Sequence, residues 1–237
     1  MKNNAGDPIG QAILDYVATN KPDDIIVCSD ICEDDIIPIE VLFRKPEEMP
    51  ELELTALERA SGKVLDVGAG AGVHALEMKR KGCDVLAIDI STGAIQHLKN
   101  EGLDAIQIDF FELKDQTFDT ITMLMNGIGI AGSLSNLEKT LAHAKSLLAS
   151  GGKILCDSCD IRYLYEDEDG ALWVNLNTEY YGNFRFQMKY KKEIGPWFDW
   201  LYVDFDSLFT AAQNVGLKAK RIYEKDDNYL AELVIGD

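Results

Sequence analysis

Residues 63–72 read Lys63-Val-Leu-Asp-Val-Gly-Ala-Gly-Ala-Gly72, and this stretch decides the fold. Its apolar first half is typical of a buried strand, its glycines indicate a tight turn, and residues 73–81 have helical spacing. Glycine allows a sharp turn and a close approach of ligand to backbone, because it has no Cβ. A helix start offers unpaired N–H groups and a positive dipole end. The stretch therefore predicts a site for a nucleotide-like ligand that carries an anionic group.

The glycine spacing separates two classes of nucleotide site. A dinucleotide fold has the pattern Gly-x-Gly-x-x-Gly, whereas this chain has Asp66-x-Gly68-x-Gly70-x-Gly72, with Val73 at the third dinucleotide position. The observed pattern resembles motif I of class I S-adenosylmethionine-dependent methyltransferases. The resemblance implies that the loop, Ala69 included, packs against the methionine part of the cofactor, and that Asp66 helps to hold its amino group. An NAD-dependent oxidoreductase is correspondingly disfavoured.

Downstream of this loop, strand-like and helix-like segments alternate. Apolar runs predict strands at 63–67, 84–90, 105–109, 120–125 and 153–157, and helical spacing is found at 71–81, 92–101 and 134–149. Such alternation predicts a parallel sheet with helices on both faces. A helix at 205–215 and antiparallel strands at 217–223 and 229–235 follow. The expected fold is α/β, a doubly wound, seven-stranded, mostly parallel sheet with an antiparallel C-terminal hairpin, as in class I methyltransferases.

The regions outside this core predict an organisation into two parts. Asp7-Pro8 is a good helix start, so a helix is expected at 8–19, and another at 50–61 is closed by Gly62. Residues 20–44 are mixed and receive no assignment. We expect an N-terminal helical or lid segment, 1–61, and an S-adenosylmethionine-binding domain, 62–237. The domain carries an inserted β-hairpin near 171–200, with its turn at Gly182-Asn183.

Two acidic residues follow the next two predicted strands. Asp89, with Ile90, lies 23 positions after Asp66, and a carboxylate there can accept hydrogen bonds from both ribose hydroxyls. The alternative role for Asp89 is to cap the next helix, although Ser91 is a ready cap. The resemblance implies that Asp109 and Phe110 meet the adenine amino group and ring. Their alternative is a loop acid beside a core phenylalanine.

Two further positions are candidate cofactor ligands by resemblance. Asn126, in Met125-Asn126-Gly127, corresponds to the loop that faces the sulfonium, and its alternative role is to form a turn. The segment 43–53 resembles a stretch ahead of motif I in bacterial small-molecule methyltransferases. Arg44 in that segment could pair with the cofactor carboxylate, since a guanidinium suits bidentate recognition, or could form a surface ion pair.

The sequence indicates substrate-binding residues less clearly than cofactor-binding residues. His74 follows the glycine loop and is a candidate contact to the cofactor or to the substrate entrance; the alternative is a plain polar residue. The loop after the fifth strand carries Asp157 and Tyr163. Trp197 and Asp199 lie in an aromatic segment that could hold a flat or cationic molecule; the alternative is that its tryptophans only pack the hairpin onto the sheet. No catalytic residue and no metal ligand set is identified.

The amino-acid composition restricts the classes of molecule that the protein is expected to bind. The formal net charge is −18 over 237 residues, which weighs against nucleic acids and anionic membranes, although a local basic patch for RNA stays possible. Met1 to Gly10 contains no apolar run that could act as a signal peptide, and no apolar run is long enough for us to expect a transmembrane helix. Five scattered cysteines suit reduced thiols in the cytoplasm; a zinc site from Cys28, Cys32, Cys156 and Cys159 is the weaker reading.

The sequence thus predicts a cytoplasmic S-adenosylmethionine-dependent methyltransferase that acts on a small-molecule acceptor. The alternatives are a non-catalytic protein that binds S-adenosylmethionine or S-adenosylhomocysteine, and a protein or RNA methyltransferase. The last is weakened by the charge and by the absence of the Asn-Pro-Pro-aromatic motif at 126. The acceptor atom, the use of a general base and the oligomeric state are not readable from the sequence.

Overall fold

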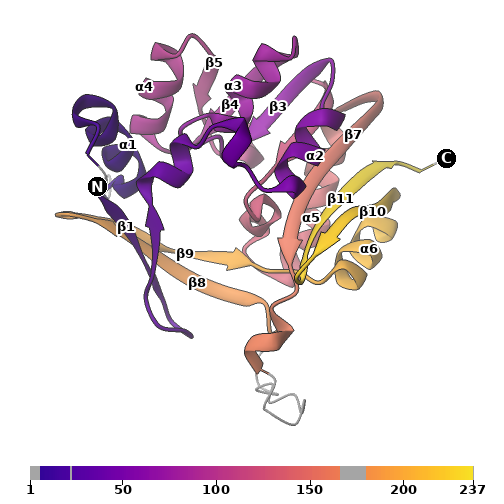
Figure 1. Ribbon diagram of the computed structural model, residues 1–237. Helices are drawn as coiled ribbons and strands as arrows, with labels where there is room; N and C mark the ends of the chain where they lie inside the picture. The colour runs from indigo at the N-terminus through magenta and orange to yellow at the C-terminus, as the bar shows by residue number, and fades with distance from the viewer. Residues whose placement is uncertain (1–5, 22, 166–179, 237) are drawn as a thin grey trace. The chain divides into compact units, whose positions relative to one another are not determined.

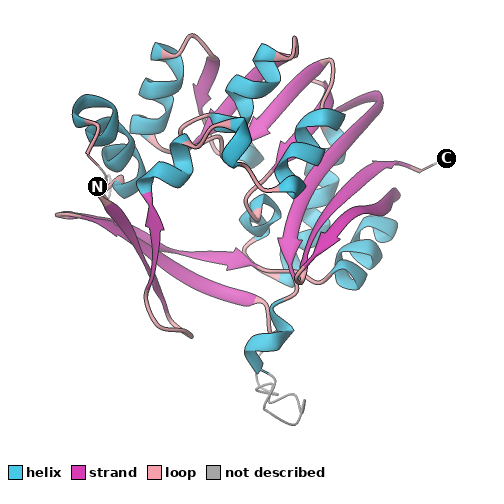
Figure 2. Ribbon diagram, viewed as in Figure 1, coloured by secondary structure: helices cyan, strands magenta, loops and turns pink. Residues whose placement is uncertain are grey.

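The computed structural model describes residues 6–21, 23–165 and 180–236. The chain divides into two compact units. The first comprises Met1–Lys114 and Arg185–Phe198, and the second comprises Asp115–Phe184 and Asp199–Asp237. Figures 1 and 2 show the helices and strands of both units.

The first unit contains three parallel strands with helices between them. Residue 63 of the first strand pairs with residue 84 of the second, and residues 86–89 of the second pair with 104–107 of the third. The elements are β3 (Lys63–Val67), α3 (Val73–Arg80), β4 (Asp84–Asp89), α4 (Thr92–Asn100) and β5 (Asp104–Gln107), preceded by α2 (Glu51–Arg59) and followed by η3 (Phe110–Glu112). The predicted strand 63–67 and the predicted alternation are confirmed.

The N-terminal helix begins where the sequence predicts. It is α1 (Pro8–Thr19), with Pro8 at its first position; Asp7 Oδ1 accepts a hydrogen bond from the backbone N–H of Gly10 over 3.0 Å. In Figure 1, α1 lies beside α4. The packing is close because both helices have a glycine at the crossing: a Cβ on Gly93 would lie 2.4 Å from the carbonyl oxygen of Gly10.

Residues 20–44, which the sequence left unassigned, form β1 (Asp24–Ser29), β2 (Asp35–Pro38) and η1 (Ile39–Phe43), and η2 (Pro46–Glu48) follows. The two strands join β8 (Asn183–Tyr190) and β9 (Glu193–Leu201) in a four-stranded antiparallel sheet of order β2-β1-β8-β9. Ile25, on β1, is fully buried in a cluster with Ala12 and Ile13 of α1. The strands form because long-range pairing and this packing stabilise them.

Strands β8 and β9 form an inserted hairpin whose turn is at Lys191-Lys192. Another turn is at Tyr181-Gly182, adjacent to the predicted turn at Gly182-Asn183, and Asn183 begins β8. In the β8–β9 turn, Lys191 has the left-handed conformation, with φ 52°. The part of the prediction at 171–179 lies outside the described residues.

The second unit contains a parallel pair and an antiparallel finish. Strand β6 runs parallel to β7, and β11 is antiparallel to both β7 and β10. The elements are β6 (Phe118–Met123), η4 (Gly127–Ala131), α5 (Leu134–Ser146), β7 (Leu148–Cys159), η5 (Ile161–Tyr165), α6 (Phe205–Asn214), β10 (Leu217–Lys225) and β11 (Asn228–Ile235). The predicted C-terminal hairpin is confirmed.

The seven-stranded sheet has the order β10-β11-β7-β6-β3-β4-β5. This is the predicted doubly wound, mostly parallel sheet with antiparallel C-terminal strands. The β7 strand is longer than predicted, because α5 ends at Ser146 and pairing with Phe118 begins at Leu148. Among the described residues, none of the helices combines the length and the apolar character that crossing a membrane requires.

Candidate functional site

The glycine loop between β3 and α3 is held against the end of β4. The backbone N–H groups of Gly68 and Ala69 donate to the carbonyl oxygen of Ile88, over 2.9 and 3.1 Å. The N–H of Gly70 donates to Oδ2 of Asp89 over 2.9 Å. Because β3 and β4 are paired parallel strands, both end at the same edge of the sheet. The hydrogen bonds hold the glycine loop against that edge.

The three glycines of the loop have left-handed backbones and different surroundings. Their φ angles are 70° at Gly68, 55° at Gly70 and 85° at Gly72. No described atom lies within 4 Å of a Cβ built on Gly68 or Gly70, whereas a Cβ on Gly72 would lie 2.4 Å from Leu98 Cδ2. Gly68 and Gly70 thus leave open space above the backbone, and Gly72 is required by helix packing.

The acidic residues at the ends of β3 and β4 have different environments. Asp66 is 2% exposed. The carboxylate of Asp89 accepts from Gly70 through Oδ2, and from the N–H of Ser91 through Oδ1 over 2.8 Å. Burial raises the pKa of Asp89, opposed by these hydrogen bonds. Its carboxyl therefore sits between two loops, and the cap of α4 is Ser91, whose Oγ accepts from the N–H of Ala94 over 3.0 Å.

Asp7, known from the sequence only as a helix cap, also reaches this region. Its Oδ2 accepts from Ser91 Oγ over 2.9 Å and from the N–H of Gly93 over 3.0 Å. The N-terminal helix is therefore hydrogen-bonded to the loop that follows Asp89. A second oxygen on a capping aspartate gives no distinct sequence signal, because the partner lies more than 80 positions away.

The predicted adenine region after β5 contains both exposed and buried residues. Asp109 caps η3, with Oδ1 accepting from the N–H of Phe111 over 2.9 Å. Phe110 is 5% exposed and belongs to the core, whereas Phe111 is 36% exposed and Ile90 73% exposed. Open apolar surface for a ring is therefore offered by Ile90 and Phe111 rather than by Phe110.

A buried ionic cluster joins three segments near the start of α3. Oε2 of Glu53, on α2, accepts from Arg44 Nη2 over 2.5 Å and contacts Nε2 of His74 over 2.8 Å. The side chains of Arg44, Glu53 and His74 are each 8% exposed. Arg44 Nη1 also donates to the carbonyl oxygen of Val41. Burial raises the pKa of Glu53, but the hydrogen bonds from His74 and Arg44 outweigh it, so the net pKa is lowered.

Arg44 therefore forms a buried ion pair, not the surface pair considered from the sequence, and its role toward a cofactor stays a prediction. Its Nε is buried, with no hydrogen-bond partner within the described part of the chain. Glu53 was missed by the sequence analysis. The available signal was its place beside Leu52 and Ala56 on the buried side of a short helix, where an acid requires a partner.

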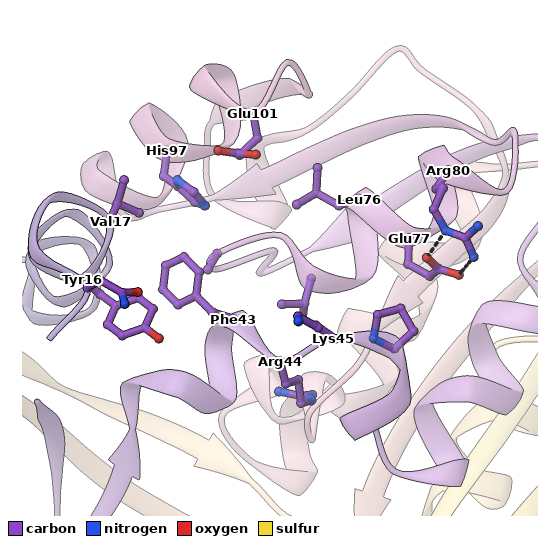
Figure 3. A pocket seen from close by; sticks show the side chains of 14 residues that line it. Tyr16, Val17, Phe43, Arg44, Lys45, Leu76, Glu77, Arg80, His97 and Glu101 are labelled. Carbon is purple, nitrogen blue, oxygen red and sulfur yellow. Dashed lines mark hydrogen bonds and ion pairs between the residues drawn. The ribbon is translucent and has the colours of Figure 1, made fainter. Parts of the chain in front are cut away.

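A cavity of about 480 Å³ lies behind the glycine loop (Figure 3). One wall is a series of rings: Tyr16 and Phe43 have centroids 4.7 Å apart, and Phe43 and His97 5.4 Å. His97 hydrogen-bonds to the backbone of Ala71, and burial lowers its pKa against the effects of Glu101 and this bond. Through His97, α4 is thus hydrogen-bonded to the glycine loop, and Phe43 packs against the His97 ring.

In the second unit, the loop after β6 is held by several hydrogen bonds. Met125 and Asn126 both have left-handed backbones, with φ 61° and 56°. The N–H of Asn126 donates to Asp157 Oδ2 over 2.9 Å, its Oδ1 accepts from Ser158 Oγ over 2.7 Å, and its Nδ2 donates to the carbonyl oxygen of Leu201 over 3.3 Å. Asn126 therefore forms the turn with its own side chain engaged.

The predicted substrate residues fall into different surroundings. Asp157 lies on β7 and holds Asn126, and Tyr163 on η5 is 52% exposed. Asp199 lies on β9, with its Cβ 3.3 Å from a Cβ built on Gly132. Trp197 belongs to the first unit and is 42% exposed. Trp200, in the second unit, packs on η4, since a Cβ on Gly129 would lie 2.3 Å from its Nε1.

The cysteines and other metal-ligating groups do not gather in the part of the chain that the structure describes. All five cysteines are free thiols, with Cys28 on β1 and Cys156 and Cys159 on β7. Burial raises the pKa of Cys159 to about 11 and that of Cys156 further. Within residues 6–21, 23–165 and 180–236, no group of three or more His, Cys, Asp or Glu side chains is placed to hold a metal ion.

Comparison with known proteins places the chain among the methyltransferases. A family model described as a methyltransferase domain matches residues 40–199. An uncharacterized methyltransferase from Staphylococcus carnosus (strain TM300) is 32% identical over 155 residues, covering 60% of this chain and 72% of that protein. A UPF0146 protein from Pyrococcus abyssi (strain GE5 / Orsay) is 45% identical over 60 residues; this match covers 25% of the chain and 46% of that relative's length.

A solved structure matches almost the whole chain. It is the crystal structure of an S-adenosylmethionine-dependent methyltransferase from Bacteroides fragilis in complex with S-adenosyl-L-homocysteine. The two proteins are 46% identical, the match covers 98% of this chain and 95% of that one, and the TM-score is 0.91.

Proposed function

The chain belongs to the S-adenosylmethionine-dependent methyltransferases, and we propose that it transfers the methyl group of that cofactor to a small-molecule acceptor by in-line displacement. The observation that carries the proposal is the edge formed by the glycine loop and Asp89. There a carboxylate is fixed by the N–H of Gly70, beside glycines with open space above them.

We assign the cofactor contacts to this edge of the first unit. Asp89 retains lone pairs for ribose hydroxyls while it accepts from Gly70 and Ser91. Gly68 and Gly70 admit the methionine part of the cofactor, because no described side chain fills the space above them. Asp109 and the exposed faces of Ile90 and Phe111 suit the adenine amino group and ring.

S-adenosylmethionine supplies an electrophilic methyl group on its sulfonium. The protein's contribution to such a displacement is alignment, which can lower the barrier by on the order of several kcal/mol. A general base is needed only where the acceptor atom carries a proton and is a weak nucleophile. The loops therefore have to hold cofactor and acceptor in line and exclude water, and no residue of this chain is assigned a proton-transfer role.

The aromatic side chains of the four-stranded sheet support a small acceptor. A Cβ on Gly195 would lie 3.4 Å from Pro8 of α1. Further along β9, Phe198 contacts Phe186 of β8 with ring centroids 6.3 Å apart, whereas the ring of Trp197 lies 5.9 Å from the guanidinium of Arg185. Tyr190 of β8 is 2% exposed in the cluster with α1, and Phe186, four residues earlier on that strand, is half-buried. Trp197 is 42% exposed, so one face of its ring is open to a small molecule.

The net charge of −18 disfavours a polyanionic acceptor, and an aromatic surface suits an apolar, aromatic or cationic small molecule. We therefore propose Trp197 as an acceptor contact. Trp197→Ala should reduce methyl transfer to the acceptor much more than S-adenosylhomocysteine affinity. Equal losses in both would indicate a packing role instead.

The first test is a calorimetric titration of the wild-type protein with S-adenosylhomocysteine and, separately, with NADH. We expect binding of the former in the micromolar range and none of the latter. Mass spectrometry of metabolites that copurify with the protein, followed by a methyl-transfer assay with those compounds, then identifies the acceptor. Cofactor binding without transfer to any copurifying metabolite would favour the non-catalytic binding protein.

A further inference from the structure

The cluster of Arg44, Glu53 and His74 is more elaborate than fold stability requires. Burying an ion pair gives little net stability, because both charges lose hydration. Here one carboxylate oxygen serves two donors, and these come from the segment before η2 and from the first turn of α3. An arrangement of this kind fixes the geometry of its members, so the question is which group it holds in place.

The arginine has unused hydrogen-bonding capacity. Its Nη2 donates to Glu53 and its Nη1 to the carbonyl oxygen of Val41, while its buried Nε has no partner among the described residues. A buried N–H without an acceptor is unfavourable, because it has lost its hydrogen bond to water. A ligand oxygen would satisfy it, and a carboxylate would do so best, because guanidinium and carboxylate form charge-assisted hydrogen bonds.

The cluster lies at the glycine loop. His74 follows Gly72 by two residues and is in the first turn of α3. Since His74 and Arg44 meet the same oxygen of Glu53, the guanidinium is anchored to the helix that begins at this loop. Figure 3 shows Arg44 below the α3 segment that carries Leu76 and Glu77.

We propose that Glu53 is a positioning residue of the cofactor site, which holds Arg44 so that its guanidinium binds the carboxylate of the cofactor's methionine part. This inference rests on the proposed function, since it requires the cofactor at the glycine loop. Glu53 itself makes no contact with the ligand. The negative charge of Glu53 is offset by Arg44. Because Glu53 is hydrogen-bonded to both His74 and Arg44, the long arginine side chain is prevented from sampling other rotamers.

The test uses two ligands that differ by one group. S-adenosylhomocysteine has the amino and carboxyl groups, and decarboxylated S-adenosylhomocysteine retains the amine alone. We expect E53Q to bind the first about 10-fold more weakly than the wild type, the effect of loosening one hydrogen bond to a charged group. Its affinity for the decarboxylated ligand should stay within about twofold, because the adenosine contacts are unchanged.

The matched control is E58Q. Glu58 is an exposed residue of α2, so the same change of charge on the same helix should leave both affinities as in the wild type. In an Arg44→Lys background, E53Q should cause no further loss for S-adenosylhomocysteine, since two residues that act as one unit are not additive.

The possible outcomes are distinct. If the wild type binds neither ligand, the proposed function fails. If the wild type binds both and E53Q loses both equally, Glu53 is only structural; if E53Q binds S-adenosylhomocysteine unchanged or more tightly, Glu53 does not position Arg44 for a carboxylate. Should E53Q fail to fold, Glu53→Asp replaces it: the shorter side chain cannot serve both donors, so the same selective loss is expected, and its absence would overturn the inference.

Discussion

Two loops that follow parallel strands reach the same backbone conformation by different routes. After β3, the left-handed positions are the glycines 68, 70 and 72; after β6, they are Met125 and Asn126. A left-handed residue with a side chain costs about 1–2 kcal/mol relative to glycine. The second loop offsets that cost with hydrogen bonds that Asn126 donates to Asp157 and Leu201 and accepts from Ser158.

The difference separates two ways to build a site. Glycine leaves open space, so the loop after β3 is shaped for something other than the protein itself. In the loop after β6, the polar groups form hydrogen bonds with other residues of the second unit. These bonds fix the path of the loop, in which Met125 is 39% exposed. Backbone strain that is maintained by a hydrogen-bond network is common at functional sites. Substitutions in each loop can separate the contributions of packing, hydrogen bonding and backbone strain.

The largest effect is expected at the glycine whose role is packing. A Cβ on Gly72 would lie 2.4 Å from Leu98 Cδ2, and the φ of 85° adds strain. Gly72→Ala should lower the free energy of unfolding by about 3 kcal/mol, through overpacking and the left-handed backbone together. Denaturant unfolding measures it.

The control is Gly82→Ala, at φ 93° with no described atom within 4 Å of the new Cβ. This variant has the backbone strain without the packing conflict, so its free energy of unfolding should fall by about 1–2 kcal/mol. Equal losses at the two positions would mean that Leu98 moves aside without cost, and that Gly72 has no packing role.

A smaller loss is expected when the network of the second loop is broken. Ser158 is 1% exposed; its Oγ donates to Asn126 Oδ1 over 2.7 Å and accepts from the N–H of Val203 over 3.0 Å. Ser158→Ala leaves both partners buried and should lower the free energy of unfolding by about 2 kcal/mol.

Thermal and denaturant unfolding of Ser158→Ala can be compared with Ser146→Ala. The hydroxyl of Ser146 donates to the carbonyl oxygen of His143 at an exposed position, where a loss within about 0.5 kcal/mol is expected. A Ser158→Ala protein as stable as this control would show that the loop does not depend on its hydrogen bonds.

The smallest effect is expected at the exposed, strained position itself. Met125→Gly removes the left-handed strain and adds freedom to the unfolded chain, so the two contributions nearly cancel, and the free energy of unfolding should change by less than about 1 kcal/mol. Methyl transfer, measured at saturating cofactor, should nevertheless fall, because the loop path is less fixed. A loss of several kcal/mol in stability would instead assign Met125 to the core.

These contrasts also explain what the sequence could predict. The β3 strand and α1 were predicted at their observed bounds, since an apolar run, a cap and a proline are local signals. The glycine spacing likewise predicted the sheet edge to which we assign the cofactor. The conformation of Met125-Asn126 carries no such signal, because its stabilising partners lie about 30 to 75 positions away.

The remaining misses have the same physical origin. Glu53 is defined by Arg44 and His74, and the strands at 24–29 and 35–38 by pairing with residues after 183. The β8–β9 turn at Lys191-Lys192 was not predicted, because the pairing of the two strands, and not a turn-favouring residue type, sets Lys191 in the left-handed conformation. Long-range packing overrode local preference in each case.

The central claim, that the open glycine of the first loop faces the cofactor, is tested most directly by titrating S-adenosylhomocysteine into Gly70→Ala and Gly82→Ala. Both changes place a methyl group in open space on a left-handed backbone, with φ 55° and 93°. We expect Gly70→Ala to stay folded and to bind at least about 10-fold more weakly than the wild type, and Gly82→Ala to bind like the wild type. Unimpaired binding by folded Gly70→Ala would contradict it.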